Sequence, residues 1–193
     1  MSDKLEQKIR KMHAAFSDVS KSDLSSVQVE VGRGYCHVDF SGGSDETDLQ
    51  NAASLLVHNI ASLKDHLKVW CQKNGAKFGG DVLIDSNRSV AIVHDLWNVD
   101  KHGELDKKPR SGIIPELRNH MTLLHFGTSD GPMSFQLDPS TGQMNNQGGK
   151  LTLFADVYDE NGNKAGRFDK ICREAADAWQ QELLSAGVSI PVA

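Results

Sequence analysis

The chain has 193 residues, a formal net charge of −5, and 38% hydrophobic and 24% charged residues. This length suits one domain with its own core, so we expect a single domain over residues 1–193. The acidic balance argues against a protein that binds nucleic acid over its whole surface, although it is compatible with a local basic patch.

The cysteines and the apolar runs of the sequence indicate the cellular compartment of the protein. Its cysteines are widely spaced and include no Cys-x-x-Cys pair, which favours neither a disulfide framework nor a zinc site. No apolar run approaches the roughly 18 residues of a spanning helix. We therefore expect no membrane insertion and a cytoplasmic location.

The first part of the chain predicts a helix, a strand pair and a longer helix. Apolar residues at helical spacing predict a helix over residues 3–17. In residues 27–40, apolar and polar residues alternate on either side of Gly32-Arg33-Gly34. This pattern indicates two strands joined by either a bulge or a tight hairpin. One long amphipathic helix is then expected from about residue 47 to residue 75.

The second part predicts a helix, a strand-rich region and a last helix. The helix is expected from residue 86 or 87 to Gly103, with Val90, Val93, Leu96 and Trp97 on its core face. Strand-like segments follow at 120–127, 132–138 and from 150, with turn pairs at Asp130-Gly131, Thr141-Gly142 and Asn161-Gly162. An amphipathic helix from about Phe168 to Gly187 closes the chain.

This order of elements predicts the fold class. It lacks the regular strand–helix–strand alternation of parallel sheets. We therefore expect an α+β fold, in which a small antiparallel sheet has amphipathic helices packed together on one side.

A polar stripe borders the apolar face of the second central helix. His94, Asn98 and Lys101 recur at helical spacing, and His102 follows at the end of the helix. On the preceding helix, Asn59, Ser62 and His66 form a similar stripe that continues to Trp70. If these helices are antiparallel neighbours, the two stripes meet across the seam.

The residue types of the stripe fit metal-independent cleavage of a phosphodiester. His66, His94 and His102 are candidates for general acid and base, Lys101 for the stabilisation of developing negative charge, and Asn98 for the orientation of an imidazole. An ordinary helix end explains the same residues, because cations are favoured in the last turn of a helix and boundary histidines often bond to backbone carbonyls.

A basic loop follows the stripe. Residues 101–120 carry a small excess of positive charge, which suits a rim that contacts the phosphates of an RNA or a nucleotide. A solvated loop with no ligand is the alternative. The candidate binding residues are Lys107, Lys108, Arg110 and Trp70.

The two central helices offer no metal motif. Neither carries a His-x-x-x-His or Glu-x-x-His pair, and the adjacent His94 and Asp95 point in divergent directions. We therefore expect neither a metal nor a cofactor.

Two short motifs carry a resemblance. His66-Leu-Lys-Val-Trp70 and Asn98-Val-Asp-Lys-His102 resemble the H-L-x-x-W and N-x-x-K-H helix motifs of a group of uncharacterised bacterial proteins, and residues 150–184 resemble the end of those proteins. The sequence departs from their pattern at Val69, Val99 and Asp100. The resemblance implies that His66, Asn98, Lys101 and His102 act together, and it implies no particular activity.

A looser resemblance is to HEPN domains, helical modules of toxin, phage-defence and RNA-processing systems. Their ribonuclease motif places an arginine a few residues before a histidine on a helix. Arg88 with His94 fits that spacing, as does Arg118 with His125, although the latter pair lies near a predicted strand. The resemblance implies RNA as a substrate or partner.

These observations leave three hypotheses. The first is a small binding module, and the second is an assembly protein, which would be a homo-oligomer if the stripe lies at a symmetric interface. The third is a metal-independent ribonuclease or phosphodiesterase. Converging imidazoles in an open cleft favour the enzyme, whereas an exposed pocket without contact among them favours the binding module.

Overall fold

The computed structural model describes most of the chain. The described residues are 3–18, 28–32, 35–39, 46–103, 105, 107–126, 134–137, 144–147 and 149–189.

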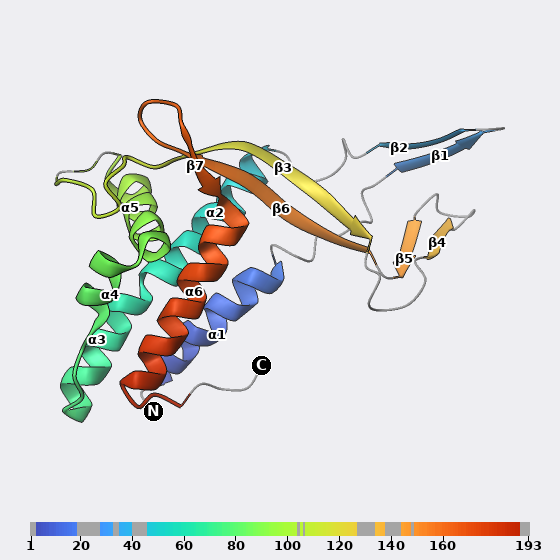
Figure 1. Cartoon of the computed structure of the whole chain (residues 1–193). Coiled ribbons are helices and arrows are strands. Elements are labelled where there is room, and N and C mark those ends of the chain that lie inside the picture. The colour runs from blue at the N-terminus through green and yellow to red at the C-terminus, as the bar shows by residue number, and fades with distance from the viewer. Residues whose placement is uncertain are drawn as a thin grey trace.

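The expected α+β class is confirmed, because helices pack together on one side of an antiparallel sheet (Figure 1). The helices are α1 (Asp3–Asp18), α2 (Glu46–Ala61), α3 (Leu63–Asn74), α4 (Gly80–Ser86), α5 (Arg88–His102) and α6 (Phe168–Ser185). The strands are β1 (Gln28–Gly32), β2 (Tyr35–Asp39), β3 (Glu116–Phe126), β4 (Ser134–Leu137), β5 (Met144–Gln147), β6 (Gly149–Tyr158) and β7 (Lys164–Arg167).

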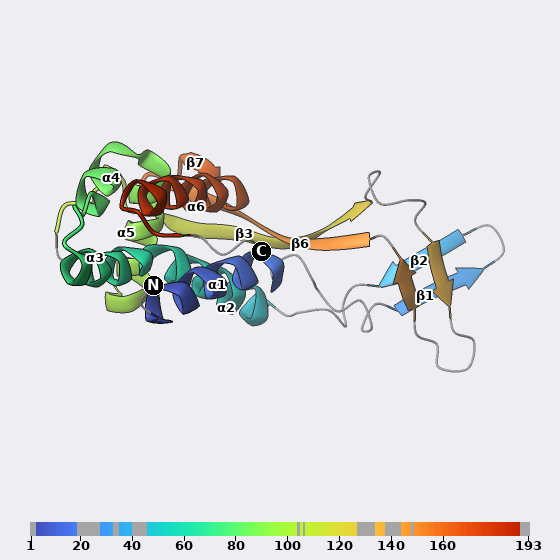
Figure 2. The same ribbon diagram turned by 90° about the horizontal axis from the view of Figure 1, so that it is seen from below.

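The three-stranded sheet has the order β3-β6-β7, and all its pairings are antiparallel. Strand β3 pairs with β6 from Glu116 opposite Tyr158 to Phe126 opposite Gly149. Strands β1 with β2, and β4 with β5, form separate two-stranded hairpins. Both hairpins lie beyond the far ends of β3 and β6, away from the helices (Figures 1 and 2).

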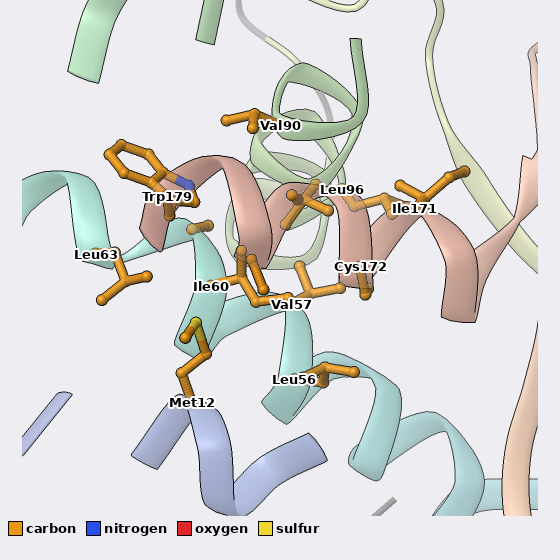
Figure 3. Close-up of a cluster of buried hydrophobic side chains, with 14 of the residues drawn as sticks. Met12, Leu56, Val57, Ile60, Leu63, Val90, Leu96, Ile171, Cys172 and Trp179 are labelled. Atoms are coloured by element: carbon orange, nitrogen blue, oxygen red, sulfur yellow. The ribbon is translucent and has the colours of Figure 1, made fainter. Parts of the chain in front are cut away.

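The core forms where α6 packs against α5, α2 and α4. One face of α6 is buried, as its apolar spacing predicts, and Trp179 is 1% exposed. Figure 3 shows Trp179, Ile171 and Cys172 of α6 directed toward apolar side chains of α2, α3 and α5. These helices therefore form the packed core that supports the polar surface of α5.

The long helix expected from residue 47 to 75 is wrong in one respect, because it divides at Ser62 into α2 and α3. The Ser62 hydroxyl donates to the carbonyl of His58, which already accepts the Ser62 amide. The bond from the His66 amide to the Ser62 carbonyl, one turn further along, is long at 3.4 Å. A serine that bonds back to the preceding turn in this way commonly bends a helix.

Helix α4 and strands β5 and β7 were not predicted, and β3 begins at Glu116, inside the expected loop. The hairpin alternative for residues 27–40 is confirmed by the pairing of β1 with β2. Arg33 and Gly34 lie outside the described residues, as do the turn pairs Asp130-Gly131 and Thr141-Gly142. Within the described part of the chain, no helix combines the length and apolar content that a membrane crossing requires.

Two adjacent leucines of α2 test which face of the helix stabilises the fold. Leu56 is 2% exposed, whereas Leu55 is 52% exposed. We expect Leu56→Ala to lower the free energy of unfolding by about 2–5 kcal/mol, because it leaves a cavity in the core. Leu55→Ala should change it by less than about 1 kcal/mol. Urea unfolding monitored by circular dichroism measures both, and equal losses would contradict this packing.

Candidate functional site

Helix α5 supplies one wall of the candidate site. It begins after Asn87, whose side chain accepts the Val90 amide at 3.1 Å, and it ends at Gly103, which has a φ of 78°. This left-handed backbone conformation favours glycine and ends the helix. The last two turns of α5 therefore present their polar side to the loop that follows.

The loop turns back over α5 at Pro109-Arg110-Ser111-Gly112. The Gly112 amide donates to the Pro109 carbonyl at 3.2 Å, and Gly112 has a φ of 78°. These features are those of a tight turn, in which proline and glycine are favoured. The turn fixes Arg110 and Ser111 at its two central positions.

Asp95 holds this turn against α5. Its Oδ2 accepts the Ser111 amide at 2.8 Å and the Ser111 hydroxyl at 2.7 Å, and Asp95 is only 2% exposed. Burial raises the pKa of the Asp95 carboxyl. The opposing bonds from Ser111 and the Arg110 amide, together with the His94 ring 3.9 Å away, outweigh burial and hold the pKa below its usual range.

Two further contacts fix the loop. The Arg110 guanidinium lies 3.2 Å from an Asp85 oxygen and 3.6 Å from an Asp81 oxygen, which ties the loop to α4. The Ile114 amide donates to Glu160 in the turn after β6 at 2.8 Å. The loop is thus bonded to three separate parts of the fold.

The last turns of α5 and this loop enclose a pocket of about 360 Å³. Its walls are formed by His94, Asp95, Asn98, His102, Leu105, Lys107, Lys108 and Arg110. The volume lies within the range of small-molecule sites in proteins. Cationic and imidazole side chains dominate this wall, and its carboxylate, Asp95, is already bonded to Ser111.

One wall of the pocket has an ordered imidazole. The Asn98 side-chain amide nitrogen lies 3.0 Å from His94 Nδ1. These two nitrogens are within hydrogen-bonding distance, so the Asn98 side chain contacts the ring on its Nδ1 side. Asn98 and His94 are thus neighbours, and the predicted role of Asn98 in orienting a catalytic imidazole stays a prediction.

Six of the predicted site residues line this one pocket, and three lie elsewhere. The six are His94, Asn98, His102, Lys107, Lys108 and Arg110. The three that do not line it are His66, Lys101 and Trp70. The pocket is thus lined by part of the helical stripe and by the basic loop. The sequence predicted these as two separate features.

Lys101 and Trp70 have other surroundings. The Lys101 ammonium lies 5.2 Å from the ring centre of Trp97, over the indole. Trp70 is buried in the core, and among the described residues its indole N–H has no hydrogen-bond partner. Trp97, expected in the core, is only partly buried at the edge of α5.

His66 and Asn59 face α1 rather than the pocket, so the expected meeting of the two polar stripes does not occur. The buried Lys8 of α1 donates to Asn59 Oδ1 at 2.9 Å. Partial burial, followed by the charges of Lys8 and Lys4, lowers the pKa of His66. The bend at Ser62 separates α3 from α5, and α3 packs instead against α1 and α4.

Sequence reasoning missed the residues that hold the loop in place. Asp95 was considered only as a metal ligand beside His94, and Ser111 was not considered. The missed signal is the spacing of Asp95, three and four positions after Ile92 and Ala91, which are both buried. A carboxylate on a buried side of a helix needs hydrogen-bond donors, and here the turn supplies them.

Among the described residues, no group of three or more histidine, cysteine, aspartate or glutamate side chains is arranged to hold a metal ion. Comparisons with known proteins found no matching family model, no similar curated protein and no similar solved structure. The resemblances inferred from the short motifs therefore stay predictions, and the site is interpreted from its own geometry.

The Asp95 bond gives a pH-dependent prediction. Asp95→Asn should lower the free energy of unfolding at pH 7 by about 1–3 kcal/mol, because it weakens bonds to a buried charge. A lowered pKa stabilises the fold above the unfolded value of about 3.9, and this contribution disappears as the pH falls through the folded value. The difference from wild type should thus be constant from about pH 5 to 8 and shrink below about pH 4.

Denaturant unfolding over this pH range provides the measurement. Asp65→Asn is the matched control, because Asp65 is exposed on α3 and does not contact the loop turn. An Asp95→Asn protein as stable as wild type at pH 7 would contradict the role of this bond.

Proposed function

We propose that this protein is a binding module that holds a phosphate-bearing ligand, either a free nucleotide or the terminal phosphate of an RNA, in the pocket between α5 and residues 103–115. One observation carries this proposal. A protein with a net charge of −5 places Lys107, Lys108 and Arg110 around one pocket with two histidines.

The charges of the pocket suit an anion. Arg110 is already paired with Asp85 and Asp81 of α4, so its main role is to hold the loop in place. Among the described residues, neither Lys107 nor Lys108 forms an ion pair, and both are exposed. Lysine ammonium groups bind phosphate as mobile point charges. Lys107 and Lys108 are therefore the residues that attract the ligand.

The imidazole side of the pocket adds directed hydrogen bonds. With His94 Nδ1 in contact with Asn98, Nε2 is the ring nitrogen that can bond to a ligand. His102 lines the same pocket from the last turn of α5, where it is exposed. Donors on one wall and ammonium groups on the other can together contact the oxygens of one phosphate.

Cleavage of a phosphodiester is the second candidate, supported by the presence of both His94 and His102 in the pocket wall. Their backbones are about 12 Å apart along the helix axis, given a rise of about 1.5 Å per residue. The expected charge stabiliser, Lys101, lies over Trp97, and His66 faces α1. Because these groups are dispersed, the geometry favours binding over cleavage.

Removal of the two loop lysines tests the binding function. We expect wild type to bind AMP and a 5′-phosphorylated RNA dinucleotide, and Lys107→Ala/Lys108→Ala to bind both at least about 10-fold more weakly, a loss of about 1.4 kcal/mol. Isothermal titration at a fixed, low salt concentration measures the affinities. Lys73→Ala/Lys77→Ala is the matched control, since it removes the same charge from exposed residues outside the pocket.

Equal affinities of the pocket variant and the control, or no binding by wild type, would overturn the proposal. Binding of AMP but not of the dinucleotide identifies a free nucleotide as the ligand. Tighter binding of the dinucleotide identifies an RNA end.

Incubation with RNA distinguishes the binding function from the phosphodiesterase function. We expect wild type to leave end-labelled single-stranded RNA intact on a denaturing gel, with or without EDTA, because the acid, base and charge stabiliser are not gathered at one phosphate. Cleavage that survives EDTA and is lost in His102→Ala would instead establish the phosphodiesterase candidate.

A further inference from the structure

Trp97 lies at the border between the phosphate pocket and a second basic region. Its indole is partly exposed on the same side of α5 as His94, Asn98 and Lys101. The His94 ring of the pocket wall lies 6.1 Å from the Trp97 ring in an edge-to-face arrangement. The His58 ring of α2 lies 6.3 Å from it. Trp97 therefore connects the pocket with the surface of α2.

The second basic region continues from His58 onto α1. Partial burial, followed by the charge of Lys8, lowers the pKa of His58, and His66 and Lys11 contribute smaller repulsions. Lys4, Lys8 and Lys11 recur at helical spacing, so they form one row along α1. This row faces the α2–α3 seam, where Lys8 bonds to Asn59.

Positive charge in this region has little compensation. Lys8 is 7% exposed, and its hydrogen-bond partner is the neutral Asn59 amide. Burial, and to a smaller extent repulsion from Lys11, lower the pKa of Lys8. The carboxylates that act on these histidines are Asp65 beside His66 and Asp100 beside His58.

These two carboxylates leave the cations in excess. Asp65 is exposed on α3, and Asp100 accepts a bond from Ser54 at 3.3 Å. Against them stand Lys101 at Trp97 and the three lysines of α1. Among the described residues named here, lysines therefore outnumber carboxylates, and one partly exposed indole lies among them.

We propose that Trp97, Lys101 and the α1 row Lys4, Lys8 and Lys11 form a basic track that extends the phosphate pocket and binds single-stranded nucleic acid. The imidazoles of His58 and His66 lie along this track as hydrogen-bonding groups rather than as cations. This inference rests on the proposed function, because the pocket holds the first phosphate of the strand. The next base stacks on the Trp97 indole, and the following phosphates contact Lys101 and the exposed Lys4 and Lys11, whereas the buried Lys8 stays bonded to Asn59. An aromatic ring among cations suits a single strand, whose bases are free to stack.

Lys101 makes this arrangement feasible. Its ammonium lies over the indole in the free protein, where it gains a cation–π contact. The side chain is exposed and long, so it can turn to a phosphate and leave the ring face to a base. A duplex has no such use for Trp97, because its bases are already stacked on each other.

The test compares AMP with a 5′-phosphorylated octanucleotide, as single-stranded RNA, single-stranded DNA and duplex. We expect wild type to bind both single strands at least about 10-fold more tightly than AMP, because additional phosphates and one base are engaged. Trp70 and Trp179 are buried, so quenching of tryptophan fluorescence by the strand reports on Trp97. Trp97→Phe should lose that quenching, and Trp97→Leu should bind the strand about 5- to 100-fold more weakly.

The variant Lys4→Gln/Lys11→Gln tests the contribution of the track to binding independently of the pocket. Both lysines are exposed, so the variant should unfold at the same temperature as wild type. It should bind AMP with unchanged affinity and the single strand at least about 5-fold more weakly. The slope of log affinity against log salt should decrease by about 0.7 for each lost phosphate contact. Lys73→Gln/Lys77→Gln is the matched control.

The outcomes distinguish the two proposals. Unchanged strand affinity in Lys4→Gln/Lys11→Gln, or equal affinity for strand and AMP in wild type, overturns the track and leaves the phosphate pocket standing. Equal binding of duplex and single strand overturns the role of Trp97 as a stacking platform. If wild type binds neither AMP nor the single strand, both the pocket proposal and the track proposal are overturned.

Discussion

The bond between the buried Asp95 carboxylate and Ser111 is the interaction on which the candidate site depends. It ties the turn at residues 109–112 to α5, and this turn carries Arg110 of the pocket wall. A carboxylate that is 2% exposed is costly to bury unless donors surround it, so the fold and the turn support each other here. The pairing of Arg110 with Asp85 fixes the same turn to α4.

The site also shows how an acidic chain can contain a cation-rich surface. Carboxylates near the pocket are already engaged: Asp95 with Ser111, and Asp85 with Arg110. Among the described residues, Lys107 and Lys108 form no ion pair, which is why the proposed binding function depends on them. On the far side of Trp97, the α1 lysines repeat this pattern, with a neutral amide as the partner of Lys8. The two regions meet at one indole, which the sequence placed in the core.

Apolar periodicity was sufficient to predict the helices that carry the site. It located α5 between Asn87 and Gly103 because a helix buried along one side repeats with the helical period. It missed the division at Ser62, where a single hydroxyl bends the chain without changing the apolar pattern. That bend directs His66 toward α1. Contacts between distant segments, such as Asp95 with Ser111, have no local sequence pattern and required the folded structure.

The most direct test of a phosphate site beside α5 is an amide-resolved NMR titration of the ¹⁵N-labelled protein with AMP. We expect the largest shifts on α5 from His94 to His102 and on residues 107–111, with unchanged signals on the exposed face of α6. We also expect Asp95→Asn to shift the signals of residues 107–111 before any ligand is added. Shifts confined to another surface, or no shifts at millimolar AMP, would contradict the central claim.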